Sequence, residues 1–564
     1  MMNKTVRWYN KLPDLSDFLE RNPSNPLEQY LSGGMELYRY HTIERYPSMG
    51  QGEEMLISPG FNPGIFINRN AYTLLYIYRY NRMNTYTPKP LYQSVDWFTI
   101  LLYAIMVVAG WFSICGASYD FGTGTLLAAD SRPLTQLQWI GISLVVIFVV
   151  MMLEEELFEM FAYPLYVAVI GLLVLTIFIA PDIKGSHSWL VLGPIRLQPA
   201  ELAKFSTALA VARLMNTYGF RLTDPRQFAK VLALIFLPMI CILMQRETGS
   251  ALVYLAFFLM LYREGMSGYV LLAGVSAVVF FVVGMKYAGV MAGETPMGQF
   301  LIALMVLVIS QILIYIEKRD VRTVKWMAIG SAVAFGIAYV VSLFVAVNFA
   351  WIGFGLIGGM VVVLVVMSVR QWIWNYALIA FFAVASLGFL YSVDYVFNNI
   401  LEPHQQIRIK VSLGLEDDPS GAGYNVNQSK IAIGSGGFLG KGFLNGTQTK
   451  LKYVPEQETD FIFCTVGEEQ GFVGATAVLV LFAAFIIRLF ALAERQDNAF
   501  GRVYGYSVAS IFLFHLVINI GMVTGLTPVI GIPLPFFSYG GSSLLGFTLL
   551  LFIFLRIDAS RRER

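Results

Sequence analysis

The run WFTILLYAIMVVAGWFSICGA, residues 97–117, decides the fold class of this 564-residue chain, because it holds 21 consecutive residues without a charged side chain. The hydrocarbon core of a bilayer is about 30 Å thick, and an α-helix needs roughly 20 apolar residues to cross it. Similar runs recur from there to the last residues of the chain. The whole chain is 57% hydrophobic and only 13% charged. A soluble domain carries about 25% charged residues. The sequence therefore predicts an all-α polytopic membrane protein.

Counting the apolar runs predicts about fourteen membrane helices. They lie near residues 97–117, 135–153, 161–181, 199–216, 229–245, 249–263, 267–287, 299–317, 325–348, 351–369, 373–393, 465–493, 503–525 and 543–557. The break at Gln245-Arg246-Glu247 is the least distinct. A polar segment from Asp394 to Asp460 precedes the last three helices, and we expect the first of these to begin inside it.

Arginine and lysine residues in the short breaks indicate the orientation, because cytoplasmic loops collect them. With the N-terminus inside, the cytoplasmic breaks contain Arg221, Arg226, Lys230, Arg263, Lys318, Arg319, Arg322, Lys325, Arg370, Arg495 and Arg502. The segment from Asp394 to Asp460 then lies outside, although it also carries basic residues. Two explanations stay open: a long translocated loop escapes the charge rule, or the cations bind an anionic ligand linked to a lipid.

Residues 1–94 are polar and rich in tyrosine, and two explanations fit them equally. They form a cytoplasmic N-terminal extension, or translation starts at Met83 and the upstream stretch is an artificial extension. The order of regions that marks a signal peptide is not visible there, and no function is predicted for this part.

The sequence gives no indication of a metal centre, a disulfide framework or a nucleic-acid partner. The three cysteines, Cys115, Cys241 and Cys464, lie in or beside apolar runs without metal-ligand spacing, so we expect them to be core residues.

Two polar clusters precede or follow helix ends that we expect to face the outside. In the first, which also contains Arg196, Glu201 and Lys204 lie three apart on one helical face, where they can neutralise each other. A structural ion pair is the simpler interpretation of that spacing, and a ligand-binding pair is the alternative. In the second, Arg408 precedes a glycine-rich stretch, residues 417–425. Such a stretch can hold phosphate oxygens, although Asp-Pro-Ser-Gly is also ordinary turn chemistry.

Two further clusters lead into the last three helices. Residues 427–447 contain Lys430, Lys441 and many small residues, which predict a short helix that ends in glycines and packs closely against another helix or a ligand. In residues 455–469, Asp460 stands where the polar loop becomes a membrane helix. It is either a helix N-cap or a partly desolvated general base, since burial raises a carboxyl pKa toward working pH.

Together and in this order, the clusters resemble the SEDS family of shape, elongation, division and sporulation proteins, which polymerise peptidoglycan glycan strands. The resemblance covers most of residues 95–558. Its strongest pieces are QPAELAK (198–204), GYN (423–425) through GTQ (446–448), residues 455–463, and NIGM (519–522) through GIPLPFFSYGGSS (531–543). Residues 430–437 and 532–535 are more similar to the elongation branch, RodA, than to the division branch, FtsW.

The resemblance implies transfer of a growing glycan from its lipid pyrophosphate to a sugar hydroxyl of the next lipid II, with inversion, on the outer side of the bacterial inner membrane. Asp460 matches the family's essential aspartate and would be the catalytic base. Glu201 and Lys204 match the charged pair of the family's central cavity and would bind substrate. The remaining substrate-binding candidates are basic residues that could stabilise the departing pyrophosphate by charge: Arg196, Arg408, Lys430 and Lys441.

The sequence departs from the family pattern in three places. Ser188 stands where the family usually has arginine, and Gln245-Arg-Glu247 replaces Gln-Pro-Asp. About four helices are also inserted into a core of about ten. The predicted division is a polar extension (1–94), a first core part (95–287), inserted packing or partner-docking helices (288–393), an extracytoplasmic catalytic loop (394–460) and a last core part with a cytoplasmic tail (461–564).

Two other functions remain as alternatives, a lipid II flippase and a non-catalytic scaffold for a transpeptidase. The resemblance implies lipid II and the nascent glycan as ligands, and a class B penicillin-binding protein and other elongation-complex membrane proteins as partners. The sequence implies no particular cofactor and leaves a divalent cation open.

Overall fold

The computed structural model of the protein describes residues 91–119, 131–183, 185–193, 195–319, 321–399, 401, 403–413, 415–416 and 423–561. Residues 1–90 lie outside this range, and so do Met83 and almost all of the predicted N-terminal extension. The Asp417-Asp418 turn also lies outside it.

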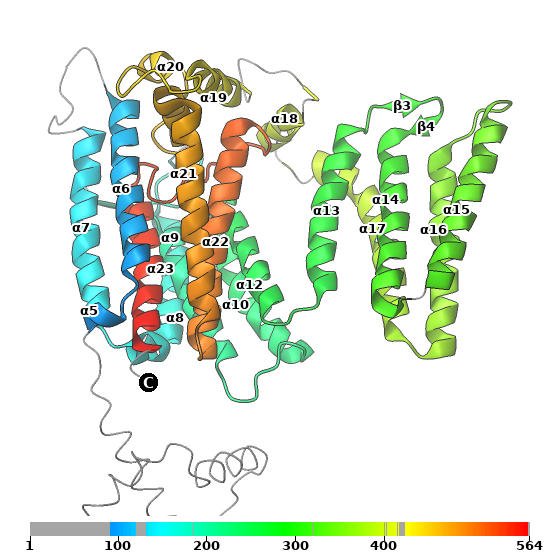
Figure 1. The fold of residues 1–564 in the computed structure, drawn as a ribbon, viewed down its shortest axis with the longest axis horizontal. Coiled ribbons are helices and arrows are strands. Elements are labelled where there is room, and N and C mark those ends of the chain that lie inside the picture. Colours follow the sequence, from blue (N-terminus) through cyan, green and yellow to red (C-terminus); the bar gives the residue numbers. More distant parts are fainter. Residues whose placement is uncertain are drawn as a thin grey trace, which may run out of the picture. The chain divides into compact units, whose positions relative to one another are not determined.

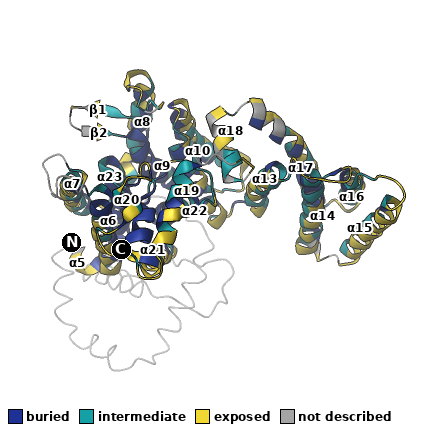
Figure 2. Ribbon diagram, turned by 90° about the horizontal axis from the view of Figure 1, so that it is seen from above, coloured by how far each residue is buried: buried dark blue, intermediate teal, exposed yellow. Residues whose placement is uncertain are grey.

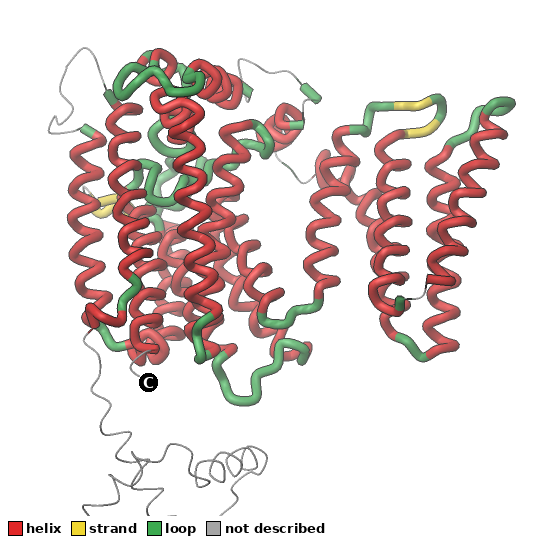
Figure 3. Tube along the Cα trace, viewed as in Figure 1, coloured by secondary structure: helices red, strands yellow, loops and turns green. Residues whose placement is uncertain are grey.

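The described residues are helical over most of their length (Figures 1 and 3). The helices are α5 (Leu91–Ser94), α6 (Trp97–Ser118), α7 (Arg132–Met152), α8 (Glu155–Ile179), α9 (Pro199–Met215), α10 (Pro225–Met244), α11 (Thr248–Leu252), η2 (Val253–Ala256), α12 (Phe257–Arg263), α13 (Gly268–Lys286), α14 (Met297–Lys318), α15 (Val321–Ser342), α16 (Phe349–Gln371), α17 (Trp374–Asn399), α18 (Pro403–Ser412), α19 (Tyr424–Ser435), α20 (Thr447–Lys450), α21 (Ile462–Glu494), α22 (Ala499–Thr524) and α23 (Gly541–Ser560).

Two short antiparallel hairpins are the strands of the described part. In the first, β1 (Leu190–Leu192) pairs with β2 (Ile195–Leu197), and in the second, β3 (Met291–Ala292) pairs with β4 (Thr295–Pro296).

Twelve helices of the described part are long and apolar enough to cross a membrane. The all-helical, polytopic membrane fold expected from the sequence is therefore confirmed. Two of the fourteen predicted spans, 199–216 and 249–263, are shorter helical segments, α9 and the run Thr248–Arg263. Helix α9 is buried along most of its length against α8, α22, α23 and α10. Because its neighbours shield it, α9 can carry charged residues that a lipid-facing helix could not.

Capping residues set where several of these helices begin. The Asp96 side chain accepts a hydrogen bond from Thr99 N at 3.1 Å at the start of α6. Asn498 does the same for Phe500 N, at 3.2 Å, at the start of α22. Each cap satisfies one backbone N–H that has no partner inside the helix. Helix α22 ends at Thr524, and its C-cap residue is Gly525, whose φ of 77° suits a residue without a Cβ atom.

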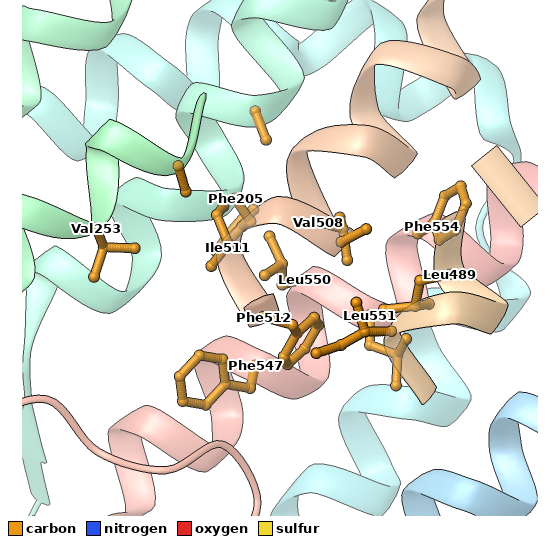
Figure 4. Packing of buried hydrophobic residues seen from close by; sticks show 14 of the residues in the cluster. Phe205, Val253, Leu489, Val508, Ile511, Phe512, Phe547, Leu550, Leu551 and Phe554 are labelled. Atoms are coloured by element: carbon orange, nitrogen blue, oxygen red, sulfur yellow. The ribbon is translucent and has the colours of Figure 1, made fainter. Parts of the chain in front are cut away.

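The main hydrophobic cluster lies where α9, α21, α22 and α23 pack together (Figures 2 and 4). Phe512 of α22 and Phe547 of α23 have ring centroids 5.6 Å apart and are among its fully buried side chains. These packed helices surround the residues of the candidate site described below.

A second hydrophobic cluster shares no residue with the first. Its buried side chains come from Phe280 of α13 and from α14, α16 and α17. Helix α15 is the most exposed of the twelve candidate spans, with 6% of its apolar window buried. The helices predicted to be inserted, residues 288–393, thus pack into a second core that they share with α13. Helix α17 continues to Asn399, beyond the predicted end of its span at residue 393.

Candidate active site

Asp460 is half-buried in the short loop between α20 and α21. Its carbonyl accepts a hydrogen bond from Asn519 Nδ2 at 2.8 Å. The two preceding carbonyls are held as well: Ser538 Oγ donates to the Thr459 carbonyl at 2.5 Å, and Tyr539 N donates to the Glu458 carbonyl at 2.7 Å. Three consecutive carbonyls are therefore anchored to α22 and to the segment before α23, which fixes the backbone that carries Asp460.

Side chains of the same loop make further contacts with neighbouring helices. Gln457 Nε2 donates to the carbonyls of Ala117, at 2.6 Å, and Thr449, at 2.8 Å. Glu458 forms an ion pair with Arg132 at the start of α7. The loop is thus tied to α6, α7 and α20 in addition to α22.

Helix α21 begins at Ile462, and its N-cap residue is Phe461. Asp460 therefore lies one residue before the N-cap position, which was one of the two roles predicted for it. Its carboxylate lies near Gly531, where a Cβ atom would be 3.3 Å from Asp460 Oδ2. The φ of Gly531 is 79°, so glycine meets both a steric and a conformational requirement at this position.

The 525–540 loop, between α22 and α23, turns back among the helices (Figure 3). Ile532, Leu534 and Phe537 are at most 1% exposed. Irregular backbone in such an environment needs hydrogen-bond partners from the protein. Asn519 Nδ2 supplies one to the Ile532 carbonyl at 2.7 Å, and His515 Nδ1 lies 3.1 Å from the Pro533 carbonyl.

The predicted ion pair between Glu201 and Lys204 is present in the first turns of α9. The distance from Lys204 Nζ to Glu201 Oε2 is 2.7 Å, and each side chain is 3% exposed. Lys204 Nζ also lies 3.3 Å from His515 Nε2 and 4.4 Å from the centroid of the Phe547 ring. The ammonium is therefore surrounded by a carboxylate, an imidazole and an aromatic face.

One turn of α22 connects this pair with Asp460, since His515 contacts Lys204 and Asn519 contacts Asp460. Sequence reasoning missed His515, and it used Asn519 only as part of a family motif. A signal was available in residues 511–523, which are apolar except for His515 and Asn519. Two polar residues four apart in a membrane helix lie on one face, and their burial is costly unless they have partners.

Lys441 has a structural set of partners. Its Nζ donates to Ser435 Oγ, Thr447 Oγ1 and Glu468 Oε1, each at 2.7 Å. An ammonium has three hydrogens, so these contacts use all of them. This geometry gives Lys441 no free donor for the pyrophosphate contact that its charge suggested.

Glu468 is the centre of that cluster and is 0% exposed. Besides Lys441, its carboxylate accepts hydrogen bonds from the backbone N–H groups of Thr447, at 2.7 Å, Gln448, at 2.9 Å, and Thr449, at 2.9 Å. Glu468 therefore attaches the start of α20 to α21. Glu468 belongs to the polar cluster of residues 455–469, in which only Asp460 was a predicted site residue.

The other basic candidates lie in different elements. Lys430 is exposed on α19, and a Cβ atom at Gly525 would be 2.5 Å from its Nζ, so its ammonium rests against the end of α22. Arg196 is exposed on β2, opposite Val191. Arg408 lies in α18, and its side chain is outside the described part.

Glu247, at the break between α10 and α11, lies close to the Glu201 pair. Burial raises the pKa of the Glu247 carboxyl, and the charge of Glu201 adds to this effect. Its carboxylate accepts hydrogen bonds from Gln198 and from Ser250, the latter at 3.0 Å, and these oppose the shift. Ser188, at the position where the resemblance leads one to expect arginine, lowers the pKa of Glu247, and its hydroxyl lies 2.6 Å from Ser186 Oγ.

Within the described ranges, no three His, Cys, Asp or Glu side chains gather into a group that could hold a metal ion. The chemistry that the site displays is that of one carboxylate on a fixed backbone, connected to a buried ion pair.

The sequence matches a protein-family model, that of the FtsW/RodA/SpoVE cell cycle proteins, over residues 95–293 and 306–563. The peptidoglycan glycosyltransferase RodA of Treponema pallidum (strain Nichols) is 29% identical over 411 residues, which are 73% of this chain and 86% of that protein. The peptidoglycan glycosyltransferase MrdB of Escherichia coli (strain K12) is 30% identical over 410 residues, which are 72% of this chain and 80% of that protein.

A solved structure is similar as well. One chain of a peptidoglycan synthase complex, described as coordinating polymerization and crosslinking, aligns with a TM-score of 0.53 and 25% identity over 83% of this chain and 98% of that chain. The family match covers most of the membrane region and contains Asp460, Asn519 and the Glu201–Lys204 pair. The chain therefore belongs to the SEDS family of FtsW, RodA and SpoVE proteins, and within it is RodA-like.

Proposed function

We propose that this chain, a RodA-like peptidoglycan glycosyltransferase, polymerises lipid II into glycan strands on the outer face of the bacterial inner membrane during cell elongation. The observation that carries the proposal is the anchoring of Asp460, whose backbone and two preceding carbonyls are held by Asn519, Ser538 and Tyr539. A catalytic base works best when its position is fixed before the substrate arrives.

In the proposed reaction, the oxygen of a sugar hydroxyl on the acceptor lipid II attacks the anomeric carbon of the growing glycan. The hydroxyl proton passes to the Asp460 carboxylate as the new carbon–oxygen bond forms. The bond from the anomeric carbon to the lipid pyrophosphate breaks, and the pyrophosphate leaves with the electron pair. Attack opposite the leaving group inverts the anomeric centre.

The departing pyrophosphate carries negative charge that nearby cations would stabilise. Arg196, Arg408 and Lys430 remain candidates for this role, whereas the hydrogen bonds of Lys441 support a structural one. Glu201 and Lys204 are proposed to bind substrate as a mutually neutralised pair.

The orientation is supported by the distribution of charge. Arg263, Arg495 and Arg502 lie in or beside breaks at the opposite end of α21 and α22 from the Asp460 loop (Figure 1). Cytoplasmic loops are enriched in such residues, so the proposed active site faces outward.

A class B penicillin-binding protein is the proposed partner, because the similar solved chain belongs to a synthase complex that couples polymerization to crosslinking. The domain division made from the sequence is also kept as a proposal. The separate cluster of α13, α14, α16 and α17 supports treating residues 288–393 as an inserted unit.

The test is a polymerisation assay with the purified full-length protein in liposomes that contain fluorescent lipid II, with and without the transpeptidase. The proposal expects glycan chains that a muramidase degrades. Movement of lipid II between leaflets without polymer would favour a flippase. Binding of the transpeptidase with no turnover in either condition would favour a scaffold.

A further inference from the structure

His515 lies in the middle of α22, is 1% exposed and has a polar contact on each ring nitrogen. We propose that His515 is a positioning residue for the glycosyl transfer: it fixes the Lys204 ammonium relative to the 525–540 loop and so keeps the Glu201–Lys204 pair in register with Asp460. This inference rests on the proposed function, and it adds a residue to which neither the family motifs nor charge had drawn attention.

The contacts of His515 define one protonation state. Its Nδ1 lies 3.1 Å from the Pro533 carbonyl, which can only accept, so Nδ1 carries the hydrogen. Its Nε2 lies 3.3 Å from Lys204 Nζ, and an ammonium can only donate, so Nε2 presents its lone pair. The two neighbours thus require the same neutral tautomer, and each contact determines the orientation of the ring for the other.

The aromatic ring of Phe547 completes this arrangement. It meets the His515 ring edge to face, with centroids 4.8 Å apart and an interplanar angle of 88°. The same ring lies 4.4 Å from Lys204 Nζ. Since His515, Lys204 and Phe547 all touch one another, the ammonium has little room to move while His515 is in place.

The connection to Asp460 runs through two consecutive carbonyls of the 525–540 loop. His515 donates to the carbonyl of Pro533, and Asn519 donates to that of Ile532. Asn519 Nδ2 has a second hydrogen, which it donates to the Asp460 carbonyl. Proline restricts its own φ to near −65°, which removes one of the two backbone torsions between these carbonyls. One turn of α22 therefore sets the distance between the buried pair and the proposed base.

A purely structural role would use His515 as packing volume for the hydrophobic cluster around Phe547. The two roles predict different rankings of variants. His515→Gln can place an amide oxygen near the position of Nε2 and so keep an acceptor for Lys204. His515→Asn can place an amide nitrogen near Nδ1 and so keep only the donor to Pro533. His515→Met fills a similar volume and keeps neither.

The experiment measures kcat and KM for lipid II polymerisation by the full chain and these three variants in liposomes, with the unfolding temperature of each in detergent. The proposal expects the kcat of His515→Met to be lower by about 10- to 100-fold. The kcat of His515→Gln and of His515→Asn, each of which keeps one of the two contacts, should lie between that of His515→Met and that of wild type. The KM for lipid II should rise as well in His515→Met, because His515 positions Lys204, which is proposed to bind substrate.

The overturning result is equally specific. If His515→Met polymerises at the wild-type rate, or if activity follows only the unfolding temperature of the variants, His515 is a packing residue. The proposed function stands in that case, because the wild-type protein polymerises lipid II. A wild-type protein that makes no polymer overturns the proposed function and this inference together.

Discussion

Asn519 Nδ2 donates a hydrogen bond to the backbone carbonyl of Asp460 at 2.8 Å and a second one to the carbonyl of Ile532 at 2.7 Å. A single amide group thereby joins the segment that carries the proposed base to the buried loop before α23. Because Asn519 is 0% exposed, no water can replace either bond without rearrangement of the helices.

Replacing Asn519 should therefore impair catalysis. In Asn519→Asp, an oxygen atom faces two carbonyl oxygens, so we expect a lower unfolding temperature and a polymerisation rate reduced at least about tenfold. Asn498→Asp is the matched control, because Asn498 is the N-cap of the same helix and aspartate is an equally good cap. Equal activity of the two variants would contradict the positioning role of Asn519.

The Glu201–Lys204 pair should show the energetics of a buried ion pair. Glu201→Gln and Lys204→Met each leave one buried charge without its partner, and we expect each to destabilise the protein by about 3–5 kcal/mol. The double variant Glu201→Gln/Lys204→Met should recover much of that stability without recovering activity. Thermal unfolding in detergent measures the first effect, and polymerisation measures the second.

An exposed pair provides the control for this experiment. Lys410 and Glu416 lie 3.7 Å apart, with side chains 40% and 50% exposed. Lys410→Met should change the stability by less than about 1 kcal/mol. The contradicting result concerns the double variant of the buried pair. If its loss of unfolding free energy equals the sum of the losses in the two single variants, the two charges do not stabilise each other.

The cluster around Glu468 predicts a ranking of variants. Glu468→Gln turns one acceptor atom into a donor that faces backbone N–H groups, so we expect a loss of about 1–3 kcal/mol and faster proteolysis between α19 and α21. Lys441→Met should destabilise the protein less, because the three backbone donors still serve the carboxylate. Lys452→Met, at an exposed site, is the control. A Lys441→Met variant with wild-type stability but no activity would restore the role in pyrophosphate binding.

Glu247 predicts a pH dependence of stability. Its pKa is raised in the folded protein, chiefly by burial, so the folded state holds the proton more tightly than the unfolded chain does. This contribution is complete below the ordinary glutamate pKa of 4.5 and is lost as the pH rises through the higher folded value. We expect the unfolding temperature to fall over that range in wild type and in Glu247→Asp, and to fall less steeply in Glu247→Gln. Identical slopes in all three proteins would contradict this assignment.

The membrane fold could be predicted from the sequence because apolar run length is a direct measure of helix span. The run at 97–117 corresponds to α6, Trp97–Ser118. The two shorter segments, α9 and Thr248–Arg263, were harder to classify, because both are shorter than the twelve candidate spans. Helix α9 is also shielded by its neighbours, so it need not have the hydropathy of a lipid-facing helix.

The candidate site was only partly predictable. The spacing of Glu201 and Lys204 predicted their ion pair, because residues three apart share a helical face. Charge alone could not show that Lys441 has a structural role while Lys430 remains a candidate for substrate binding. The carboxylate that binds Lys441, that of Glu468, lies 27 residues away in the sequence. The contact between His515 and Lys204, 311 residues apart, likewise depends on how α9 and α22 pack.

The central claim is that the Asp460 carboxylate is the base of a glycan polymerase, and one comparison tests it most directly. The test compares the purified wild-type protein with Asp460→Asn and with the control Asp497→Asn, which lies at an exposed site beyond α21. The unfolding temperature of each protein is measured first, to show that the variants are folded. Each protein is then assayed for lipid II polymerisation. The account predicts that Asp460→Asn folds and inserts like wild type but polymerises about 100- to 10,000-fold more slowly, while Asp497→Asn retains full activity. Full polymerisation by a correctly folded Asp460→Asn would contradict it.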